Sequence, residues 1–558
     1  MAKNEFKKII TGGTIYLKVL YCMVNNMQIT KNQNIELDID DFTSEGSGVG
    51  KYNGMAVFVS GAAAGDTVIA HIIKVKKNYA IGKVQRVLKP SVRRIKPECP
   101  VFPSCGGCAF QHISYKFETE YKKEHVENAF KRLAHIDISP DKIITGAETR
   151  YRNKAQYPVT FEQNELKIGF YAPHTHRVIN CNDCMLQPEI FSNIVGIIRK
   201  WIAEYGISVY NPETKKGLIR HIYLRQGTAA NQIMVCLVIN GDTLPKSEKL
   251  IERLNVISYI KSIIINTNRE DTNVILGSKC KTLWGDDYIY DILCGVKIRL
   301  SPLSFYQVNH DMAEKLYEKA AEFAGLTGNE TVLDMYCGTG TIGLSMAKNA
   351  KKIIGVEIVP EAIDDAKVNA SENNIKNAEF FCGDAPQAAE MLKLKGISPD
   401  VIILDPPRKG CAPELLTTIA AMEAAKIVYV SCDPATLSRD CKILADLGYT
   451  IKKLTSADLF PRTVHVESVA LLLKTVEIYN NDLLLNIDKI HTTPMGENRI
   501  RKNLGTNSPD VVELCINMIL NPDCKITRNG KNWYAEIDNC IITVNAYSFT
   551  IITAHKVK

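Results

Sequence analysis

Hydrophobic and polar positions alternate most regularly between residues 330 and 474, where short apolar runs are separated by amphipathic stretches of helical length. Buried strands that alternate with helices in this way are typical of a parallel, doubly wound sheet. We therefore predict an α/β domain over residues 301–474. The apolar runs occupy residues 331–336, 351–358, 378–383, 401–407 and 426–431, and two closing strands are expected near Thr450 and Val466.

Strand-like segments are also dense between residues 33 and 89, but glycines rather than helices separate them. Short strands at this spacing predict a small β-barrel of the oligonucleotide-binding kind over residues 31–92. The segment resembles a TRAM domain, which implies an RNA-binding barrel of the type carried by RNA-modifying enzymes. A barrel that serves only as a packing module is the alternative.

The pattern elsewhere is mixed. Residues 93–300 combine helical spacing at 115–136, which predicts a surface helix, with strand-like runs, so an α+β domain is expected there. Residues 475–558 predict a helix near 508–520 and several strands, again a small α+β domain, whose role the sequence does not reveal. Residues 1–30 form an N-terminal extension.

The length of 558 residues and a hydrophobic content of 46% are enough for several cores. No run of about 18 apolar residues is present, so a membrane-spanning helix is not expected. Residues 14–27 are interrupted by Lys18 and lack a small-residue cleavage site, and Met27 offers a second start. We expect a cytoplasmic protein, and no pattern indicates an obligate protein partner.

The net charge of +7 is unevenly distributed, because residues 74–96 alone hold nine Lys or Arg residues and no acid. Such a stretch predicts a phosphate-facing patch, with a solvated face as the alternative. Arg220, His221 and Arg225 are further candidates for RNA contacts, although a solvated surface position is the simpler expectation for each.

Seventeen cysteines are too few for a disulfide scaffold, so thiols that are reduced, catalytic or metal-bound are expected. Cys99, Cys105 and Cys108 form a C-x5-C-x2-C pattern, and a C-x2-C pair follows at Cys181 and Cys184. A zinc site would use the two C-x2-C pairs and leave Cys99 unused. An iron-sulfur cluster would use the first three cysteines and one of the second pair. Spacing alone does not choose between these alternatives.

The loop after the first strand of the α/β domain, residues 337–343, satisfies the pattern G-x-G-x-x-G. Glu357 closes the next strand at the distance expected of an acid that binds ribose hydroxyls. By itself this pattern fits NAD or S-adenosylmethionine (SAM). Asp334, Asp384 and Asp405 lie at the ends of neighbouring strands, and Asp405 begins an Asp-Pro-Pro turn of the kind that suits a flipped nucleobase. This set of acids favours SAM.

Cys432 stands where the apolar run 427–430 breaks off just before Pro434. Proline cannot continue a central strand, so the sulfur is expected at the carboxyl end of a buried strand, where open α/β sheets react their substrates. A free thiol is mostly protonated at neutral pH, and we expect the helix predicted over 435–447 to favour the thiolate through its dipole. An inert buried cysteine is the alternative.

Carbon 5 of a pyrimidine is a weak nucleophile, but addition of a thiolate to carbon 6 enables carbon 5 to attack a methyl donor. A base must then remove the proton from carbon 5. Glu467, a carboxylate at the start of the last, otherwise apolar strand, is the candidate, with a structural ion pair as the alternative. His465 is more simply explained as a structural or surface residue.

Residues 30–474 resemble the 23S rRNA (uracil-5-)-methyltransferases, the TRAM-bearing, 4Fe-4S-containing branch of the SAM-dependent RNA 5-methyluridine methyltransferases. The resemblance rests on the cysteine pattern, on residues 305–309 and on the motifs around Cys432 and Glu467. It implies a Rossmann-like class I methyltransferase domain and methylation of a uridine in 23S rRNA. The tRNA-directed relatives lack the barrel and the cluster motif, so tRNA is the alternative substrate, and an RNA-binding assembly factor without catalysis is a further alternative.

The resemblance also implies roles for individual residues. Cys432 would be the nucleophile and Glu467 the base. The implied SAM-pocket residues are Gln307, Tyr336, Glu357, Asp384 and Asp405. The implied ligands of the 4Fe-4S cluster are Cys99, Cys105, Cys108 and Cys184, with Cys184 preferred over Cys181. The chain departs from the family pattern after Lys474, where the C-terminal domain is added.

Overall fold

The computed structural model describes residues 29–475, 483–521 and 523–557. They divide into two compact units, of which the first extends to residue 473 and the second consists mainly of the residues from Lys474 onward. The segment 14–27 and the alternative start at Met27 lie outside the described residues. None of the helices in the described ranges is both long enough and apolar enough to cross a membrane.

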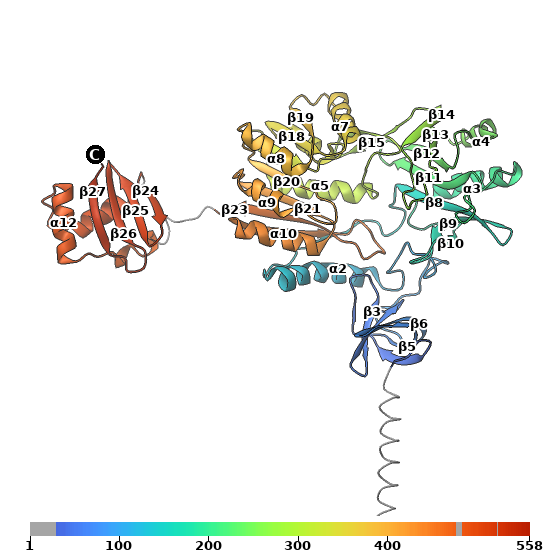
Figure 1. The fold of residues 1–558 in the computed structure, drawn as a ribbon, viewed down its shortest axis with the longest axis horizontal. Helices are drawn as coiled ribbons and strands as arrows, with labels where there is room; N and C mark the ends of the chain where they lie inside the picture. The colour runs from blue at the N-terminus through green and yellow to red at the C-terminus, as the bar shows by residue number, and fades with distance from the viewer. Residues whose placement is uncertain (1–28, 476–482, 522, 558) are drawn as a thin grey trace, which may run out of the picture. The chain divides into compact units, whose positions relative to one another are not determined.

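The first unit begins with a β-domain, blue in Figure 1, whose six strands follow the order β1-β5-β6-β4-β3-β2. Alternate side chains of these strands, such as Val57 and Val59, meet in a small core. Gly50 allows two strands to approach closely, because a Cβ atom there would lie 2.2 Å from the carbonyl oxygen of Asp38. The strand-rich domain predicted here is confirmed. Its strands are β1 (Asn34–Asp38), β2 (Asp41–Phe42), β3 (Gly48–Tyr52), β4 (Met55–Ser60), β5 (Thr67–Val75) and β6 (Tyr79–Lys89).

Helix α2 (Tyr115–Ala129), followed by the π-helical turn η1 (Phe130–Ala134), lies between the β-domain and the large α/β sheet (Figure 1). Its Tyr121 ring packs on Phe42 of strand β2, with ring centroids 5.4 Å apart. Glu118 and Lys122 are completely buried. The helical spacing predicts a surface helix here. The structure instead encloses one of its charged faces, because further charged groups of the chain lie opposite.

The middle of the first unit is a seven-stranded sheet in the order β10-β9-β8-β11-β12-β13-β14, on which helices α3 (Glu189–Glu204) and α4 (Ser247–Leu254) bury their apolar faces. The expected α+β character of this region is therefore present. The strands are β8 (Lys154–Glu162), β9 (Glu165–Tyr171), β10 (Val178–Asn180), β11 (Ile219–Gly227), β12 (Gln232–Ile239), β13 (Ile260–Thr267) and β14 (Lys279–Gly285), with a separate hairpin of β15 (Ile289–Leu293) and β16 (Val296–Leu300).

Three candidate RNA contacts of strand β11 are buried in this region. Arg220 donates to backbone carbonyls of the 268–270 turn, and Arg225 donates to backbone carbonyls of residues 301–304, at distances of 2.7 to 2.9 Å. His221 is 9% exposed. The structure corrects both expectations for these residues, RNA contact and solvated surface, because β11 is an inner strand between β8 and β12. Their charges and donors serve the packing of loops.

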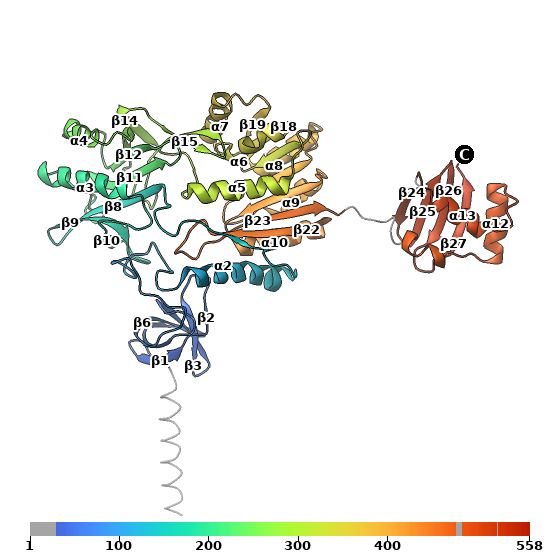
Figure 2. The ribbon, with the colours of Figure 1, turned by 180° about the vertical axis from the view of Figure 1, so that it is seen from behind.

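The rest of the first unit is built on an eight-stranded sheet in the order β19-β18-β17-β20-β21-β23-β22-β7. Strands β17 to β21 are parallel, whereas β23 runs antiparallel to β21. Helices lie on both faces of this sheet (Figures 1 and 2), so the doubly wound prediction is confirmed. The edge strand β7 (Ile143–Ile144) comes from outside the predicted range 301–474 and pairs in parallel with β22.

The strands of this sheet after β7 are β17 (Thr331–Met335), β18 (Lys352–Glu357), β19 (Ala378–Cys382), β20 (Val401–Leu404), β21 (Lys426–Ser431), β22 (Tyr449–Ala457) and β23 (Glu467–Lys474). The helices around it are α5 (His310–Ala324), α6 (Thr341–Met346) with the 3₁₀ turn η2 (Ala347–Asn349), α7 (Pro360–Glu372), α8 (Ala385–Leu394), α9 (Pro413–Ala420) and α10 (Pro434–Asp446).

The second unit has its own core, in which Trp533 and Ile542 of an antiparallel sheet meet Ile500 and Cys515 of two helices. Helix α13 (Val511–Ile519) lies within the predicted range 508–520, whereas α12 (Pro494–Leu504) was not predicted. The small α+β domain expected here is therefore present. Its sheet consists of β24 (Lys525–Asn529), β25 (Asn532–Ile537), β26 (Cys540–Asn545) and β27 (Ile551–Lys556), and a 3₁₀ turn, η3 (Ile487–Lys489), precedes the helices.

Candidate active site

The loop between β17 and α6 turns sharply at the carboxyl end of the sheet. Tyr336 has a φ of 65° and Gly340 a φ of 82°, both in the left-handed region. A non-glycine residue held in this conformation is a mark of functional sites. Gly343 packs so closely that a Cβ atom there would lie 2.9 Å from the Asp334 carboxylate, which accepts a hydrogen bond from the Gly343 amide. The glycine pattern thus serves to bring a helix N-terminus against the first strand.

Glu357 lies beside this loop at the end of β18. Its carboxylate accepts hydrogen bonds from the amides of Gly338, Ile358 and Val359 at 2.8 to 3.1 Å. These bonds fix a carboxylate at the mouth of the loop, in the position from which an acid holds ribose hydroxyls in nucleotide-binding sheets. The structure therefore places Glu357 where the sequence predicts it.

The other predicted SAM-pocket residues gather at the same edge of the sheet. Asp405 directly follows β20, and burial raises its pKa to about 7. Asp384 is the exposed N-cap of α8, immediately after β19. Gln307 precedes α5, and its side chain, like that of Thr341 at the start of α6, lowers the pKa of the Tyr317 hydroxyl against the larger effect of burial. Segments far apart in the sequence thus converge on one loop.

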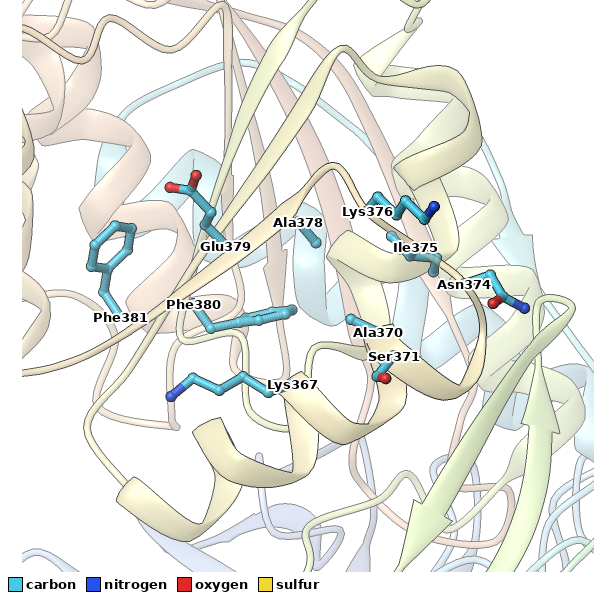
Figure 3. Close-up of a pocket in the computed structure, with 10 residues that line it drawn as sticks. All are labelled: Lys367, Ala370, Ser371, Asn374, Ile375, Lys376, Ala378, Glu379, Phe380 and Phe381. Atoms are coloured by element: carbon cyan, nitrogen blue, oxygen red, sulfur yellow. The ribbon is translucent and has the colours of Figure 1, made fainter.

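An open pocket beside this edge is separate from the predicted site. It lies between α7 and β19 and is lined by residues such as Lys367, Ser371 and Phe380 (Figure 3). None of the predicted site residues lines it. The Phe380 ring separates it from the glycine loop, since Cβ atoms added at Gly340 and Gly355 would meet that ring.

Cys432 and Glu467 lie opposite each other on neighbouring strands. In the antiparallel ladder of β21 and β23, Val430 pairs with Val469 and Ser431 with Ser468, so the next pair in this register is Cys432 and Glu467. The carboxylate raises the pKa of the thiol by its charge, which also places the two groups within electrostatic reach. Nucleophile and base candidates, 35 positions apart in the chain, are brought together by one strand pairing.

The environment of this pair is apolar and acidic. Burial, reinforced by the Asp405 carboxylate, raises the pKa of Glu467 to about 8, and Arg408 lowers it. Burial, followed by the charges of Glu467 and Asp405, raises the pKa of Cys432 to about 11, against a lowering effect of Arg408. A carboxyl group whose pKa lies near 8 is suited to accept a proton near neutral pH.

The expected help from helix α10 to the thiolate is not found. Asp433 caps this helix, and its carboxylate accepts the amides of Ala435 and Thr436 at 2.9 and 3.0 Å. The helix N-terminus is therefore occupied by a carboxylate rather than by the sulfur. The prediction of a lowered thiol pKa is wrong for the free protein, since burial and two carboxylates outweigh every favourable group.

Arg408 is a residue of this site for which no role was predicted. It follows the Asp-Pro-Pro turn, and its guanidinium lies 3.2 Å from Nε2 of His465. Burial and the positive charge of Arg408 lower the pKa of His465 to about 4, so this imidazole is uncharged at neutral pH. An exposed cation directly after an acidic turn at a strand end was the available signal in the sequence.

We expect the alkylation rate of Cys432 to depend on the charges of Glu467 and Arg408. Replacing Glu467 with glutamine removes a carboxylate, so the thiol pKa should fall and alkylation by iodoacetamide at pH 8 should accelerate about threefold to tenfold, one pKa unit being a tenfold change in thiolate fraction. Arg408→Met should slow alkylation, because it removes the cation that lowers the pKa. Peptide mass spectrometry resolves Cys432 from the other thiols. Equal rates in all three proteins would contradict this account.

The five cysteines of the two sequence patterns line one small cavity. The amide of Gly107 donates to the sulfur of Cys105 at 3.4 Å, and the side-chain amide of Gln111 donates to Cys108 at 3.6 Å. The neighbouring Cys181 thiol lowers the pKa of Cys184, against the effect of burial. Amide donors around sulfur are typical of thiolate ligands in iron-sulfur proteins.

The donor set therefore suits a thiolate-bound metal, and the structure brings Cys181 as close as the four predicted ligands. Among the residues that the structure describes, however, no group of three or more His, Cys, Asp or Glu side chains has metal-binding geometry.

Comparison with known proteins agrees with this site. Residues 114–475 match the family profile described as tRNA (Uracil-5-)-methyltransferase, and residues 28–85 match the TRAM domain. Residues 484–555 match a family described only as a protein of unknown function, DUF3781.

Curated relatives and a solved structure cover most of the chain. An uncharacterized RNA methyltransferase of Clostridium tetani is 44% identical over 453 residues, 81% of this chain and 98% of that protein. One from Clostridium acetobutylicum is 45% identical over 449 residues, 80% of this chain and 98% of that protein. The crystal structure of Pyrococcus abyssi tRNA (uracil-54, C5)-methyltransferase in complex with S-adenosyl-L-homocysteine is 27% identical, with a TM-score of 0.64, and the match covers 78% of this chain and 99% of that one.

Proposed function

The chain belongs to the tRNA (uracil-5-)-methyltransferase family, and from this premise we propose that it methylates carbon 5 of a uridine in 23S rRNA with SAM as the methyl donor. The observation that carries the proposal is the register of β21 and β23, whose last pair, Ser431 with Ser468, leaves Cys432 and Glu467 as the next residues along the two strands at the edge of the sheet where the glycine loop lies. A thiol and a base facing each other are what addition to carbon 6 and proton removal from carbon 5 require. Since the family and the relatives are RNA methyltransferases, the alternative of a non-catalytic assembly factor is set aside.

The proposed reaction begins when Cys432 releases its proton to solvent and the resulting thiolate bonds to carbon 6 of the uracil. The electron pair of the carbon 5–carbon 6 double bond then attacks the methyl group of SAM, and S-adenosylhomocysteine leaves. Glu467 takes the proton from carbon 5. The carbon–sulfur bond breaks, the double bond returns, and the thiolate is regenerated. Gln307, Tyr336, Glu357, Asp384 and Asp405 are the proposed SAM contacts.

The substrate is the part of the proposal that relatives leave open. The barrel and the five clustered cysteines support rRNA, because the resembling rRNA enzymes carry both features. The solved neighbour is named for uridine 54 of tRNA, which makes tRNA the second candidate. We expect protein incubated with methyl-labelled SAM to form 5-methyluridine in unmethylated 23S rRNA and not in tRNA. Label in tRNA alone would overturn the rRNA assignment, and label in neither would overturn the proposed activity.

We further propose that Cys99, Cys105, Cys108 and Cys184 hold a 4Fe-4S cluster. When bound, such a cluster would supply a rigid cross-link between the cysteine loop and the 181–184 turn, since the proposed methyl transfer moves no electrons.

The cluster proposal is tested by metal analysis. Protein purified without oxygen should be brown, with broad absorbance near about 400 nm. Cys184→Ser should lose iron, whereas the matched variant Cys181→Ser should keep it, because the resemblance assigns only Cys184 as a ligand. Colourless protein that contains zinc would overturn the assignment, and iron loss in both variants would overturn the choice of Cys184.

A further inference from the structure

Residues 458–466, named here the base loop, join β22 to β23 and lead directly into Glu467. Glu467 is 4% exposed, and the base loop is the backbone that leads into it. The place from which its carboxylate reaches out therefore depends on how the base loop is held. The contacts that fix the base loop also determine the direction of the Glu467 side chain.

The carbonyl groups of the base loop are held by residues from outside the methyltransferase domain. Phe460 accepts from the Lys122 ammonium at 3.2 Å, and Pro461 accepts from the Tyr151 hydroxyl at 2.8 Å. The Arg462 carbonyl accepts two amides at 2.9 and 3.1 Å, those of Ala109 and Phe110, which directly follow Cys108. Three successive carbonyl groups are thus bound by helix α2, by the segment before β8 and by the cysteine loop.

A buried ion cluster holds the start and the middle of the base loop. Lys122 lies 2.7 Å from Glu118 and 2.7 Å from Asp458, the first residue of the base loop, and all three side chains are inaccessible to solvent. Glu118 in turn accepts the amide of Arg462 at 2.7 Å. Arg462 has a φ of 69°, a conformation that a non-glycine residue keeps only where its surroundings enforce it.

The β-domain contributes the last contact. Val464 packs against Phe110 in the aromatic cluster that also contains Phe42 of β2. At Gly46, in the turn between β2 and β3, an added Cβ atom would lie 2.8 Å from the Val464 side chain. The barrel therefore touches the base loop three residues before Glu467.

We infer that Lys122, Glu118 and Tyr151 are positioning residues, which clamp the base loop and thereby aim Glu467 at carbon 5 of the substrate. The inference rests on the proposed function and goes beyond it. In addition to binding RNA, the N-terminal modules would hold Glu467 in the position that proton removal requires. Because the clamp acts on Glu467 rather than on the sulfur, its loss should slow proton removal and leave addition and methyl transfer intact.

The test separates these steps with two substrates. RNA that contains 5-fluorouridine at the target has no proton to lose at carbon 5, so its covalent adduct with Cys432 reports only the steps before the base acts. In Lys122→Met we expect adduct formation to stay within about twofold of wild type, while turnover of ordinary RNA falls about 10- to 100-fold, the cost of a misplaced catalytic group. Lys116→Met, an exposed position of the same helix, is the control and should change neither rate.

Tyr151→Phe, which removes a single hydroxyl, provides a variant that folds if Lys122→Met does not. We expect a smaller loss of turnover, about threefold to tenfold, with unchanged adduct formation and with faster amide hydrogen exchange in residues 458–466. Equal losses in both assays, or no loss of turnover, would overturn the positioning role while wild-type activity persists. Failure of the wild-type protein to form any adduct would instead overturn the proposed function itself, and the inference with it.

Discussion

Replacing Cys432 with alanine is expected to abolish both 5-methyluridine formation and the covalent RNA adduct. Without the sulfur, carbon 5 has no route to become nucleophilic, and removal of a covalent nucleophile elsewhere costs about 10⁴-fold or more in turnover. Cys432→Ala should still bind SAM, because the sulfur is separate from the glycine loop. Quantitative mass spectrometry of the RNA nucleosides measures the loss, and denaturing gels of RNA that contains 5-fluorouridine measure the adduct.

Cys280→Ala is the matched control, since this thiol is exposed and lies on β14, in a different sheet. It should turn over at the wild-type rate. Substantial methylation by Cys432→Ala, or an adduct that maps to another cysteine, would contradict the role of Cys432 as the nucleophile. Retained SAM binding in the inactive variant would show that the loss is chemical rather than structural.

Replacing Glu467 with glutamine should trap the reaction one step later. The sulfur can still add and the methyl group can still transfer, but the proton on carbon 5 has no acceptor, so a methylated adduct should accumulate on ordinary RNA. General-base catalysis contributes roughly 10²- to 10⁴-fold, which sets the expected fall in turnover. The adduct should be visible as a gel shift and contain one methyl group from labelled SAM.

The control for this variant is Glu379→Gln, an exposed carboxylate on edge strand β19. It should leave turnover unchanged and show no trapped adduct. Because the pKa of Glu467 is raised to about 8, wild-type proton removal should also speed up as the pH rises from 7 to 9, and this rise should vanish in Glu467→Gln. Loss of the adduct together with turnover would mean that Glu467 acts before methyl transfer.

Much of the catalytic half follows from local sequence. The alternation of apolar runs and helices suffices for the doubly wound sheet, since each strand signals itself by its own composition. Cys432 and Glu467 could be named because a thiol and a carboxylate at the ends of apolar strands are chemically out of place there. The resemblance implied only a sheet order that brings Glu467 near the strand of Cys432, and the antiparallel direction of β23 beside β21 is what the structure adds.

The pKa values and the burial of charged side chains could not be predicted from the sequence, because they depend on segments that are distant in the chain. Burial and the charges of Glu467 and Asp405 raise the pKa of Cys432, so an argument from the dipole of the following helix alone predicted the wrong direction. Arg225 and Lys122 look like surface cations because some of the groups that bury them lie far away in the chain. Besides Glu118, one helical turn earlier, Lys122 contacts Asp458, 336 positions further on.

The pairing of strand β7 with β22 limits where such a chain can be recombined in evolution. Its backbone runs along β22, where Asp141 donates to Leu454 and Asp458 donates to Ile144. A recombination at residue 301 would leave β22 with a bare hydrogen-bonding edge, a template for aggregation. A crossover between β7 and β22 therefore separates two strands that pair, whereas a crossover after β23, where the second unit begins, leaves this pairing intact.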